Sequence, residues 1–343
     1  MKSVASLPNN LSEEKTDLST LVKLVEDEMG LVEEWLRTNL IDDNPFVEDL
    51  LKQVFLAGGK RIRPLIVLLA SRATAPRQEE FSRLHIILAV LTELIHTASL
   101  VHDDVIDKAS VRRGQETINK RWNERLAVLM GDLLFAQASI CLARIMNPTV
   151  VGIYGQVLGD LCAGEIKQMR QQFSTTVDWE LYKIKSVGKT ASLFAAGSHS
   201  GAILNGCPNN TIQSLKDYGL NLGLCFQIVD DLLDVTASEE QTGKPVGGDL
   251  RNGVITAPSM FILEGGGKNA ARLKELIDSR AVLEDGGVQE ALKIIRDGGG
   301  VDKTIELAGD YARKSKECLS VLPDSQYKSA LASLSDYVMN RTC

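Results

Sequence analysis

Residues 84–107 read LHIILAVLTELIHTASLVHDDVID, and this stretch decides the fold class. It is an apolar run with scattered polar residues that leads directly into two adjacent aspartates. No proline lies between Pro76 and Pro148, and proline is rarely tolerated inside a helix. The stretch also lacks the alternation of apolar and polar residues that marks a half-buried strand. We therefore expect a long helix that ends close to an acidic pair.

The same pattern extends over the rest of the chain. The interval between Pro148 and Pro208 is also free of proline, and its residues are dominated by helix formers such as Ala, Leu, Glu and Lys. We predict an all-α protein with a flexible N-terminal segment at residues 1–15 and a single domain at 16–343. The expected helices cover residues 16–38, 45–57, 61–74, 79–102, 117–146, 149–172, 178–204, 209–235, 254–263, 269–279, 287–296, 301–321 and 325–340.

The composition argues against several classes of protein. A net charge of −7 and an isoelectric point near 5.3 do not favour nucleic-acid binding, which requires a clustered basic face. The six cysteines include no CxxC pair, so neither a zinc site nor a disulfide framework is indicated. No run of about 18 uninterrupted apolar residues occurs, so we expect a soluble protein and not an integral membrane protein. The start of the chain resembles neither a signal peptide nor a transit peptide.

The segment from Leu100 to Asp107 contains the first candidate site. Asp103 and Asp107 are four residues apart and therefore project from one face of a helix. Like charges at this spacing repel each other, so we expect a cation between them. Taken alone, this DDxxD pattern fits an acidic helix end exposed to solvent equally well.

The acidic pattern occurs a second time, which favours a metal site. Residues 226–234 read FQIVDDLLD and again close a long apolar helix with aspartates. A solvated turn does not require an apolar helix leading into it twice. Two facing carboxylate clusters can instead bind Mg²⁺ ions, which prefer oxygen ligands, keep several waters and bridge substrate phosphates.

The chain also offers cations that suit a phosphate group. GGKRIRP occupies residues 58–64, and Arg112 and Arg113 follow the first acidic segment. The planar guanidinium matches phosphate oxygens, although each basic run alone also fits an exposed helix start. His96 lies about two helical turns before Asp103, so it is either a hydrogen-bond donor to a bound diphosphate or a core histidine.

Six segments of the chain, in this order, resemble the motifs of the trans-isoprenyl diphosphate synthase family. Helices before and after them fit the same fold, so the resemblance covers nearly the whole chain. It implies one helical bundle around a central elongated cavity. Within the family, the sequences of these motifs are most similar to the long-chain solanesyl or octaprenyl type of cyanobacteria and plastids. The segments are GGKRIRP (58–64), HTASLVHDDVID (96–107) followed by RRG (112–114), GEIKQ (164–168), GKTASL (188–193), FQIVDDLLD (226–234) and GKPVGGDLRNG (243–253).

The resemblance also implies roles for individual residues. The ligands of Mg²⁺ on the allylic diphosphate are implied to be Asp103, Asp107, Asp230, Asp231 and Asp234, with Asp104 assisting. The residues implied to contact the allylic substrate are Arg112, Lys189, Thr190, Gln227 and Lys244. Those implied to hold isopentenyl diphosphate are Lys60, Arg63, His96 and Arg113, with Arg61 as support. Catalytic roles are implied for Asp103, Asp107, Asp230, Lys189 and Lys244.

The reaction implied by the resemblance is a Mg²⁺-dependent prenyl transfer. Isopentenyl diphosphate is added in successive trans condensations to an allylic primer, such as farnesyl or geranylgeranyl diphosphate, and pyrophosphate is released. The implied product is an all-trans polyprenyl diphosphate of about eight or nine isoprene units, about C40–C45. The resemblance further implies a homodimer, and a location in the plastid stroma of a photosynthetic eukaryote or otherwise in the cytoplasm.

Two small residues bear on product length. Ala98 and Ser99 lie five and four positions before Asp103, where short-chain members of the family commonly carry a bulky residue that acts as a floor. Their size favours a long product, because the growing tail must run down the helix away from the metal site. The alternative is that both residues merely permit close helix packing.

Other functions fit the sequence less well. A terpene cyclase needs a different second metal motif, and a two-metal phosphohydrolase usually collects several histidines, of which this chain has four in all. A regulatory subunit of a heteromeric synthase usually degrades one aspartate motif, whereas both are intact here. The regulatory subunit and a shorter-chain synthase of the geranylgeranyl type are the alternatives to a long-chain synthase.

Overall fold

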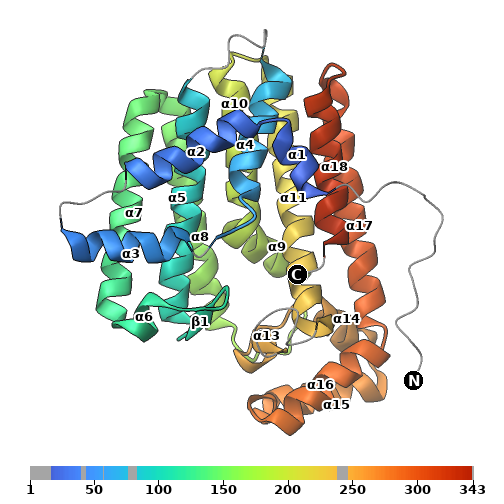
Figure 1. Ribbon diagram of the computed structural model, residues 1–343. Coiled ribbons are helices and arrows are strands. Elements are labelled where there is room, and N and C mark those ends of the chain that lie inside the picture. Colours follow the sequence, from blue (N-terminus) through green and yellow to red (C-terminus); the bar gives the residue numbers. More distant parts are fainter. Residues whose placement is uncertain (1–16, 40–43, 57, 76–82, 238–245, 342–343) are drawn as a thin grey trace.

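The computed structural model describes residues 17–39, 44–56, 58–75, 83–237 and 246–341. Helices dominate this part of the chain, so the all-α prediction is confirmed (Figure 1). The α-helices are α1 (Leu18–Lys23), α2 (Glu26–Thr38), α3 (Pro45–Leu56), α4 (Ile62–Thr74), α5 (Arg83–Ile106), α6 (Ile118–Arg121), α7 (Glu124–Ile145), α8 (Pro148–Arg170), α9 (Trp179–Ser186), α10 (Ser192–Leu204), α11 (Asn209–Thr236), α13 (Gly248–Arg251), α14 (Ala257–Gly265), α15 (Gly267–Asp278), α16 (Asp285–Asp297), α17 (Gly300–Cys318) and α18 (Gln326–Asn340). A π-helix spans Val187–Ala191, 3₁₀-helices span Ala281–Leu283 and Leu319–Val321, and the strands are β1 (Val111–Arg112) and β2 (Gln115–Glu116).

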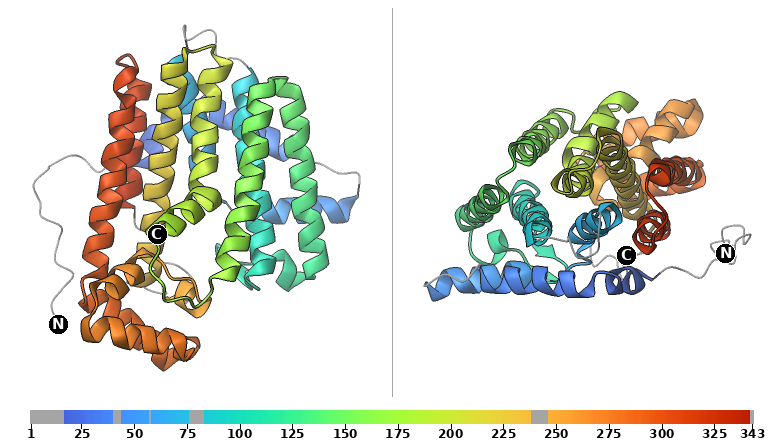
Figure 2. Two further views of the ribbon diagram at one scale, coloured as in Figure 1. Left: turned by 180° about the vertical axis from the view of Figure 1, so that it is seen from behind. Right: turned by 90° about the horizontal axis from the view of Figure 1, so that it is seen from above.

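Helix α5 is the central helix of the bundle. Every residue from His85 to Ile95 is buried, as expected for an apolar helix with neighbours on all sides. It packs against α2, α4, α7 and α10, while α11 packs against α10 and α17. Seen from above, the long helices stand side by side and α1, α2 and α3 lie across one side of the bundle (Figure 2). This arrangement buries one main apolar core.

Capping residues determine where several helices begin. The Asn123 side chain accepts a hydrogen bond from the backbone N–H of Leu126 (2.9 Å), which starts α7. Asn147 caps α8 in the same way, and Pro148 follows at the first helical position, where its missing N–H costs nothing. The prediction of one helix over residues 117–146 was therefore wrong, because the chain breaks between α6 and α7.

Three further local features differ from the prediction. The expected helix at 178–204 is α9 and α10 joined by the π-helix, and the expected helix at 79–102 continues to Ile106. The side chain of Asn119 donates to the backbone carbonyls of Asp104 (3.1 Å) and Ala109 (3.0 Å), so it satisfies carbonyl groups at the end of α5. Strands β1 and β2 form a small hairpin, with Arg112 opposite Gln115.

A second, smaller apolar core lies below the main bundle, where α13 to α16 gather in Figure 1. Leu273, Leu292 and Ile295 are fully buried there. Ile255 packs against both the smaller and the main core, so the two cores are in contact. The prediction of a single domain over residues 16–343 remains a prediction.

Helices α7 and α8 expose apolar side chains on their outer face. Leu129 and Ile140 of α7 are 55% and 44% exposed, and Ile166 of α8 is 60% exposed. Both α5 and α7 are long and apolar enough to cross a membrane by length and composition alone. Of the apolar 18-residue stretch in α5, 78% is buried inside the protein, whereas only 33% of the corresponding stretch in α7 is buried.

Candidate active site

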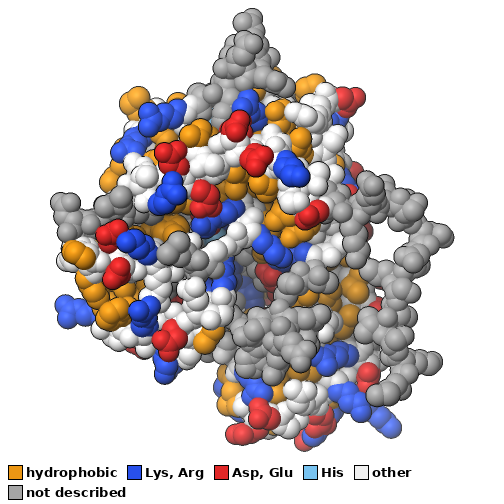
Figure 3. All heavy atoms as spheres, viewed as in Figure 1, with side chains coloured by type: hydrophobic (Ala, Val, Ile, Leu, Met, Phe, Trp, Pro, Cys, Tyr) orange, Lys and Arg blue, Asp and Glu red, His pale blue; other side chains and the backbone are white. Residues whose placement is uncertain are grey.

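A cavity of about 900 Å³ opens between the C-terminal ends of α5 and α11 and the loop before α4. Lys and Arg side chains are visible in a recess at the middle of the face drawn in Figure 3. The predicted site residues on the cavity walls are Lys60, Arg61, Arg63, His96, Ser99, Asp103, Asp107, Arg112, Arg113, Lys189, Thr190, Gln227, Asp230, Asp231 and Asp234. Ala98 is fully buried and does not line this cavity, and Lys244 lies outside the described residues.

The first acidic wall is the end of α5. Burial raises the pKa of Asp103 to about 6, and the nearby charge of Lys189 counteracts this shift. The charges of Asp103 and Asp107 in turn raise the pKa of Lys189, so this lysine offsets part of the repulsion between the two carboxylates. Asp104 does not line this cavity. Its carboxylate accepts a hydrogen bond from Nε of Arg112 (2.7 Å). Asp104 thus orients Arg112, which itself lines the cavity.

The second acidic wall is the C-terminal end of α11, where Asp231 is held by a chain of hydrogen bonds. Its carboxylate accepts from the hydroxyl of Tyr182 (2.6 Å) and from Nε2 of Gln227 (2.8 Å). The hydroxyl of Thr190 donates in turn to Oε1 of Gln227 (2.7 Å). Burial raises the pKa of Asp231 to about 7, and repulsion from Asp249 contributes to the shift. This chain fixes the second acidic wall to both α9 and the π-helix.

Asp234 and Asp249 bring a third segment to the site. The carboxylate of Asp234 accepts hydrogen bonds from the backbone N–H groups of Gly248 (3.0 Å) and Asp249 (3.1 Å), at the start of α13. Burial, together with repulsion from Asp249, raises the pKa of Asp234 to about 7. Asp249 lines the cavity but was not predicted as a site residue. Its position within GKPVGGDLRNG was the only sequence signal for it.

The π-helix carries Lys189 into the cavity. Gly164 of α8 and Gly188 approach each other closely, because a Cβ atom on Gly188 would lie 3.5 Å from Cα of Gly164 and 2.7 Å from the carbonyl oxygen of Asp160. At this contact, Nζ of Lys189 lies 3.7 Å from the carboxylate of Glu165. Burial alone would lower the pKa of Lys189, but Asp103 and Glu165 outweigh burial and raise it. Lys189 therefore stays protonated.

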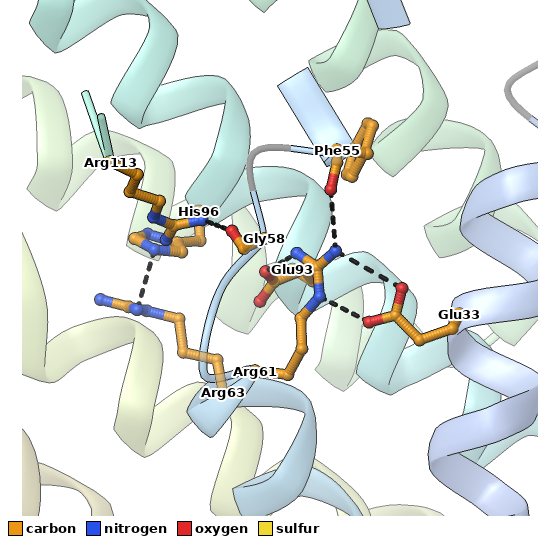
Figure 4. A network of polar contacts seen from close by, with 8 residues as sticks. All are labelled: Glu33, Phe55, Gly58, Arg61, Arg63, Glu93, His96 and Arg113. Carbon is orange, nitrogen blue, oxygen red and sulfur yellow. Dashed lines mark hydrogen bonds and ion pairs between the residues drawn. The ribbon is translucent and has the colours of Figure 1, made fainter. Parts of the chain in front are cut away.

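The opposite wall is basic, and Figure 4 shows its main contacts. Nη1 of Arg63 donates a hydrogen bond to Nε2 of His96 (2.9 Å). Burial, together with the charge of Arg63, lowers the pKa of His96 well below its usual value. His96 is therefore a neutral imidazole whose Nε2 accepts, so its remaining proton is on Nδ1. Burial also lowers the pKa of Arg63 to about 10, and its Nε is buried without a hydrogen-bond partner.

The loop before α4 is shaped by glycines and by Arg113. Gly58 adopts a positive φ of 68°, and its carbonyl accepts a hydrogen bond from Arg113. A Cβ atom on Gly59 would lie 2.8 Å from Nη1 of Arg113, so a side chain at this position would displace the guanidinium of Arg113. The loop and the β1–β2 hairpin thus hold Lys60 and Arg113 on one side of the cavity.

Arg61 has a supporting position. Its guanidinium donates to Glu33 (2.6 Å) and to Glu93 (2.7 Å), and it also contacts the carbonyl of Phe55 (Figure 4). Most of its donors are therefore used inside the protein. The expected role of Arg61 as a support for the basic residues around it stays a prediction.

Arg341, which follows α18, was not predicted as a site residue. Its Nη2 donates to the carboxylate of Asp230 (2.5 Å) and to the carbonyl of Phe226 (2.8 Å), and its guanidinium lies 3.6 Å from the centre of the Phe226 ring. Burial raises the pKa of Asp230, and Arg341 counteracts this shift. The sequence gives no signal for this contact, because Arg341 is a lone arginine 111 residues from Asp230.

The acidic walls suit a hard divalent cation. Their donors are carboxylate oxygens from three segments, and the neutral His96 lies among arginines on the opposite wall. Among the described residues, no three acidic, histidine or cysteine side chains converge into a metal site by themselves. This arrangement fits Mg²⁺, which takes one or two carboxylates, keeps several waters and completes its shell with substrate phosphates.

The chain matches a known protein family and several curated proteins. The sequence model of the family described as polyprenyl synthetase matches residues 44–295. The chain is 42% identical over 332 residues to solanesyl diphosphate synthase 2, chloroplastic, of Arabidopsis thaliana, which covers 96% of this chain and 78% of that protein. It is also 42% identical over 323 residues to a prenyl transferase of Synechocystis, which covers 94% and 98% of the two chains.

Solved structures agree with these matches. A polyprenyl synthase of Caulobacter crescentus, complexed with calcium and isoprenyl diphosphate, has a TM-score of 0.89 at 32% identity and covers 96% of this chain and 100% of that chain. The heptaprenyl diphosphate synthase of Staphylococcus aureus has a TM-score of 0.87 at 33% identity, with the same coverage. The span that the family model matches includes every predicted site residue from Lys60 to Lys244.

Proposed function

This chain belongs to the polyprenyl synthetase family, and we propose that it is a long-chain trans-prenyl diphosphate synthase of the solanesyl type. It would add isopentenyl diphosphate repeatedly to an allylic diphosphate, such as farnesyl or geranylgeranyl diphosphate, and release pyrophosphate. The observation that carries this proposal is one cavity in which two aspartate-rich helix segments face a basic wall. The names of the relatives support the long-chain product.

The acidic walls would hold the metal ions and the allylic diphosphate. The ligands proposed are Asp103 and Asp107 on one side and Asp230, Asp231 and Asp234 on the other. When bound, Mg²⁺ supplies the positive charge that stabilises a diphosphate leaving group. Lys189 projects from the π-helix between these walls and stays protonated, so it would donate hydrogen bonds to the departing diphosphate. Lys244, as another cation for the leaving group, is a proposal from the family resemblance alone.

The basic wall would hold isopentenyl diphosphate. Arg63 is buried with an unpaired Nε–H, and such a group gains a partner when an anion binds. Lys60 and Arg113 line the same side of the cavity, and the Nδ1 proton of His96 is available to a phosphate oxygen. His96 is a poor proton acceptor here because its Nε2 already accepts from Arg63. We therefore infer that the proton released in each condensation passes to pyrophosphate.

The apolar part of the cavity would protect the reactive carbocation. Leu100, Phe226 and Leu233 line the cavity next to the charged groups. Excluding water prevents hydrolysis of an allylic cation and strengthens the electrostatic contacts around it. Ser99 lines this region, whereas Ala98 packs inside the bundle, so Ser99 is the small residue that leaves room for a tail.

We also propose that two copies of the chain associate through the exposed apolar face of α7 and α8. Leu129, Ile140 and Ile166 would be removed from water in such a homodimer. Light scattering should then give about twice the mass of 37.4 kDa of one chain, and a monomer at micromolar concentration would contradict the proposal. A soluble protein of a plastid or a cytoplasm is consistent with the chloroplastic and cyanobacterial relatives.

The test of the proposed function is direct. Purified protein is incubated with Mg²⁺, labelled isopentenyl diphosphate and either farnesyl or geranylgeranyl diphosphate, and the dephosphorylated products are sized. We expect products of about eight or nine isoprene units that disappear with EDTA, and Asp103→Asn should lower the rate by about 100-fold or more. The exposed Asp302→Asn serves as the control and should leave the rate unchanged. Products of only four units would indicate a geranylgeranyl type, and no product with any primer would indicate a regulatory subunit.

A further inference from the structure

Phe173, in the loop after α8, has an unusual backbone conformation. Its φ of 61° lies in the left-handed region, which bulky residues rarely adopt. Such a conformation persists only where the surrounding contacts hold it in place. The backbone N–H of Phe173 donates a hydrogen bond to the carbonyl of Gly253 (2.7 Å), and the guanidinium of Arg280 lies 3.6 Å from the centre of the Phe173 ring. These contacts fix the ring between segments that are far apart in the sequence.

The Phe173 ring packs directly against the backbone of Gly253. A Cβ atom on Gly253 would overlap the ring, and Gly253 itself has a positive φ of 72°, so this position requires glycine. Phe173 also packs against the smaller apolar core, to which Leu250 of α13 belongs. In Figure 1, α13 lies between the long helices above and α15 and α16 below. The ring therefore joins the loop after α8 to the turn after α13.

The turn after α13 determines where Asp249 lies. The backbone N–H of Val254 donates a hydrogen bond to the backbone carbonyl of Asp249 (2.8 Å). The backbone N–H of Gly253 donates to the carbonyl of Leu250 (3.0 Å). The backbone N–H of Asp249 donates in turn to the carboxylate of Asp234 (3.1 Å), one of the proposed metal ligands. A displacement of Gly253 would therefore pass through α13 to the second acidic wall.

A separate contact holds α13 to the helices below it. The guanidinium of Arg251 donates hydrogen bonds to the carbonyl of Leu283 (3.1 Å) and to the carboxylate of Asp285 (2.6 Å). These bonds do not involve the loop after α8. Loss of the Phe173 ring should therefore shift α13 while Arg251 keeps it attached.

On the basis of the function proposed above, we propose that Phe173 is a positioning residue for the second acidic wall. Its ring holds the turn after α13 in the place where the N–H of Asp249 meets the carboxylate of Asp234. Loss of a group that orients a metal ligand typically lowers metal affinity by about 10- to 100-fold. Phe173 acts on Asp234 through Gly253 and Asp249, so its effect belongs at the lower end of this range.

Removal of the ring should weaken metal use and leave the basic wall unaffected. Phe173→Ala should need about tenfold more Mg²⁺ for half of its maximal rate, and excess Mg²⁺ should restore most of kcat. The KM for isopentenyl diphosphate should change by less than about twofold, because Lys60, Arg63 and Arg113 lie on the opposite wall. Gly253→Ala, which displaces the ring from the other side of the contact, should give the same pattern. Phe173→Tyr keeps the ring and should behave like the unaltered protein.

Metal binding should also be measured without turnover. Mg²⁺ raises the melting temperature of a protein that binds it in the folded state. At a fixed, saturating concentration of inorganic pyrophosphate, the Mg²⁺ concentration for half of the rise in Tm should be about tenfold higher in Phe173→Ala. If Phe173→Ala does not fold, Arg280→Gln removes only the exposed guanidinium from the ring and should shift this concentration by about threefold.

The matched control is Tyr311→Ala. Tyr311 of α17 is likewise a partly buried aromatic residue under a cation, since Nζ of Lys314 lies 5.0 Å from the centre of its ring. Tyr311 does not line the active-site cavity. Its truncation removes a ring of similar size without touching the turn after α13, so the Mg²⁺ requirement should stay unchanged even if the Tm without Mg²⁺ falls.

Two results would overturn the role of Phe173. One is an unchanged Mg²⁺ requirement in both Phe173→Ala and Gly253→Ala. The other is an equal shift in Tyr311→Ala, which would attribute the effect to general destabilisation. Unaltered protein that makes no prenyl product from any primer would overturn the proposed function, whereas the melting experiment would still decide the role of Phe173. A long-chain product together with an unchanged Mg²⁺ requirement of the Phe173 variants would leave the proposed function intact.

Discussion

The charge of Asp231 should destabilise the protein in the absence of metal. The pKa of this carboxyl rises from 3.8 to about 7 in the folded protein, first because of burial and then because of Asp249. A raised pKa means that the folded protein binds a proton where the unfolded chain does not. The stabilisation from this proton is complete below about pH 4 and is lost as the pH rises through about 7.

Replacement of Asp231 by Asn tests this with little change in shape. A shift of about three units corresponds to about 4 kcal/mol, of which about 3 kcal/mol falls between pH 5 and pH 8. We therefore expect metal-free Asp231→Asn to gain about 3 kcal/mol of stability relative to the unaltered protein on going from pH 5 to pH 8. The same variant should lose most of its activity, since a carboxamide is a weaker metal ligand than a carboxylate.

The assay is urea unfolding in EDTA at pH 5 and pH 8, with the exposed Asp302→Asn as the control. For the control, the free energy of unfolding should differ from that of the unaltered protein by the same amount at both pH values. The reasoning would be refuted if the stability of Asp231→Asn relative to the unaltered protein does not change with pH, or if the variant is the less stable of the two at pH 8. Such a result would mean that the hydrogen bonds from Tyr182 and Gln227 stabilise the carboxylate by as much as burial and Asp249 destabilise it.

Two further predictions concern the positioning of the site. Gly188→Ala should lower kcat by about tenfold or more, because the added methyl group would push α8 away from the π-helix that carries Lys189. The control is Gly30→Ala in α2, which has open space around it and should retain activity and gain up to about 1 kcal/mol of helix stability. Arg341→Gln should lower kcat/KM by about tenfold, since a buried partner of Asp230 is lost; the exposed Arg313→Gln on α17 is the control, and equal steady-state kinetics for the two variants would show that Arg341 has no role.

Much of the fold and of the site could be predicted from local sequence patterns. Long intervals without proline predicted the long helices α5, α8 and α11, because a helix needs little more than suitable residues and an apolar face. The two aspartate segments and the basic loop were found because each is contiguous. Their placement around one cavity agrees with the family resemblance, which links motifs that are far apart in the chain.

The residues that were missed depend on contacts that no local pattern encodes. Arg341 reaches Asp230 through the packing of α18 against the bundle, and Asp249 reaches Asp234 through the start of α13. The π-helix also escaped prediction, since a sequence such as VGKTA has ordinary helix propensities. The wider turn occurs where Gly188 comes close to α8, a contact between segments that are distant in the sequence.

The π-helix has a consequence for how the gene can change over time. A π-helical turn contains one residue more than an α-helical turn, so loss of one residue from 187–191 would restore an ordinary helix. Everything on one side of the deletion would then rotate by about 100° relative to the other. Either Tyr182 would leave Asp231, or Phe194 would leave the ring of Phe226 that it contacts at 5.2 Å. Substitutions can accumulate in this segment, but insertions and deletions of even one codon should be purged.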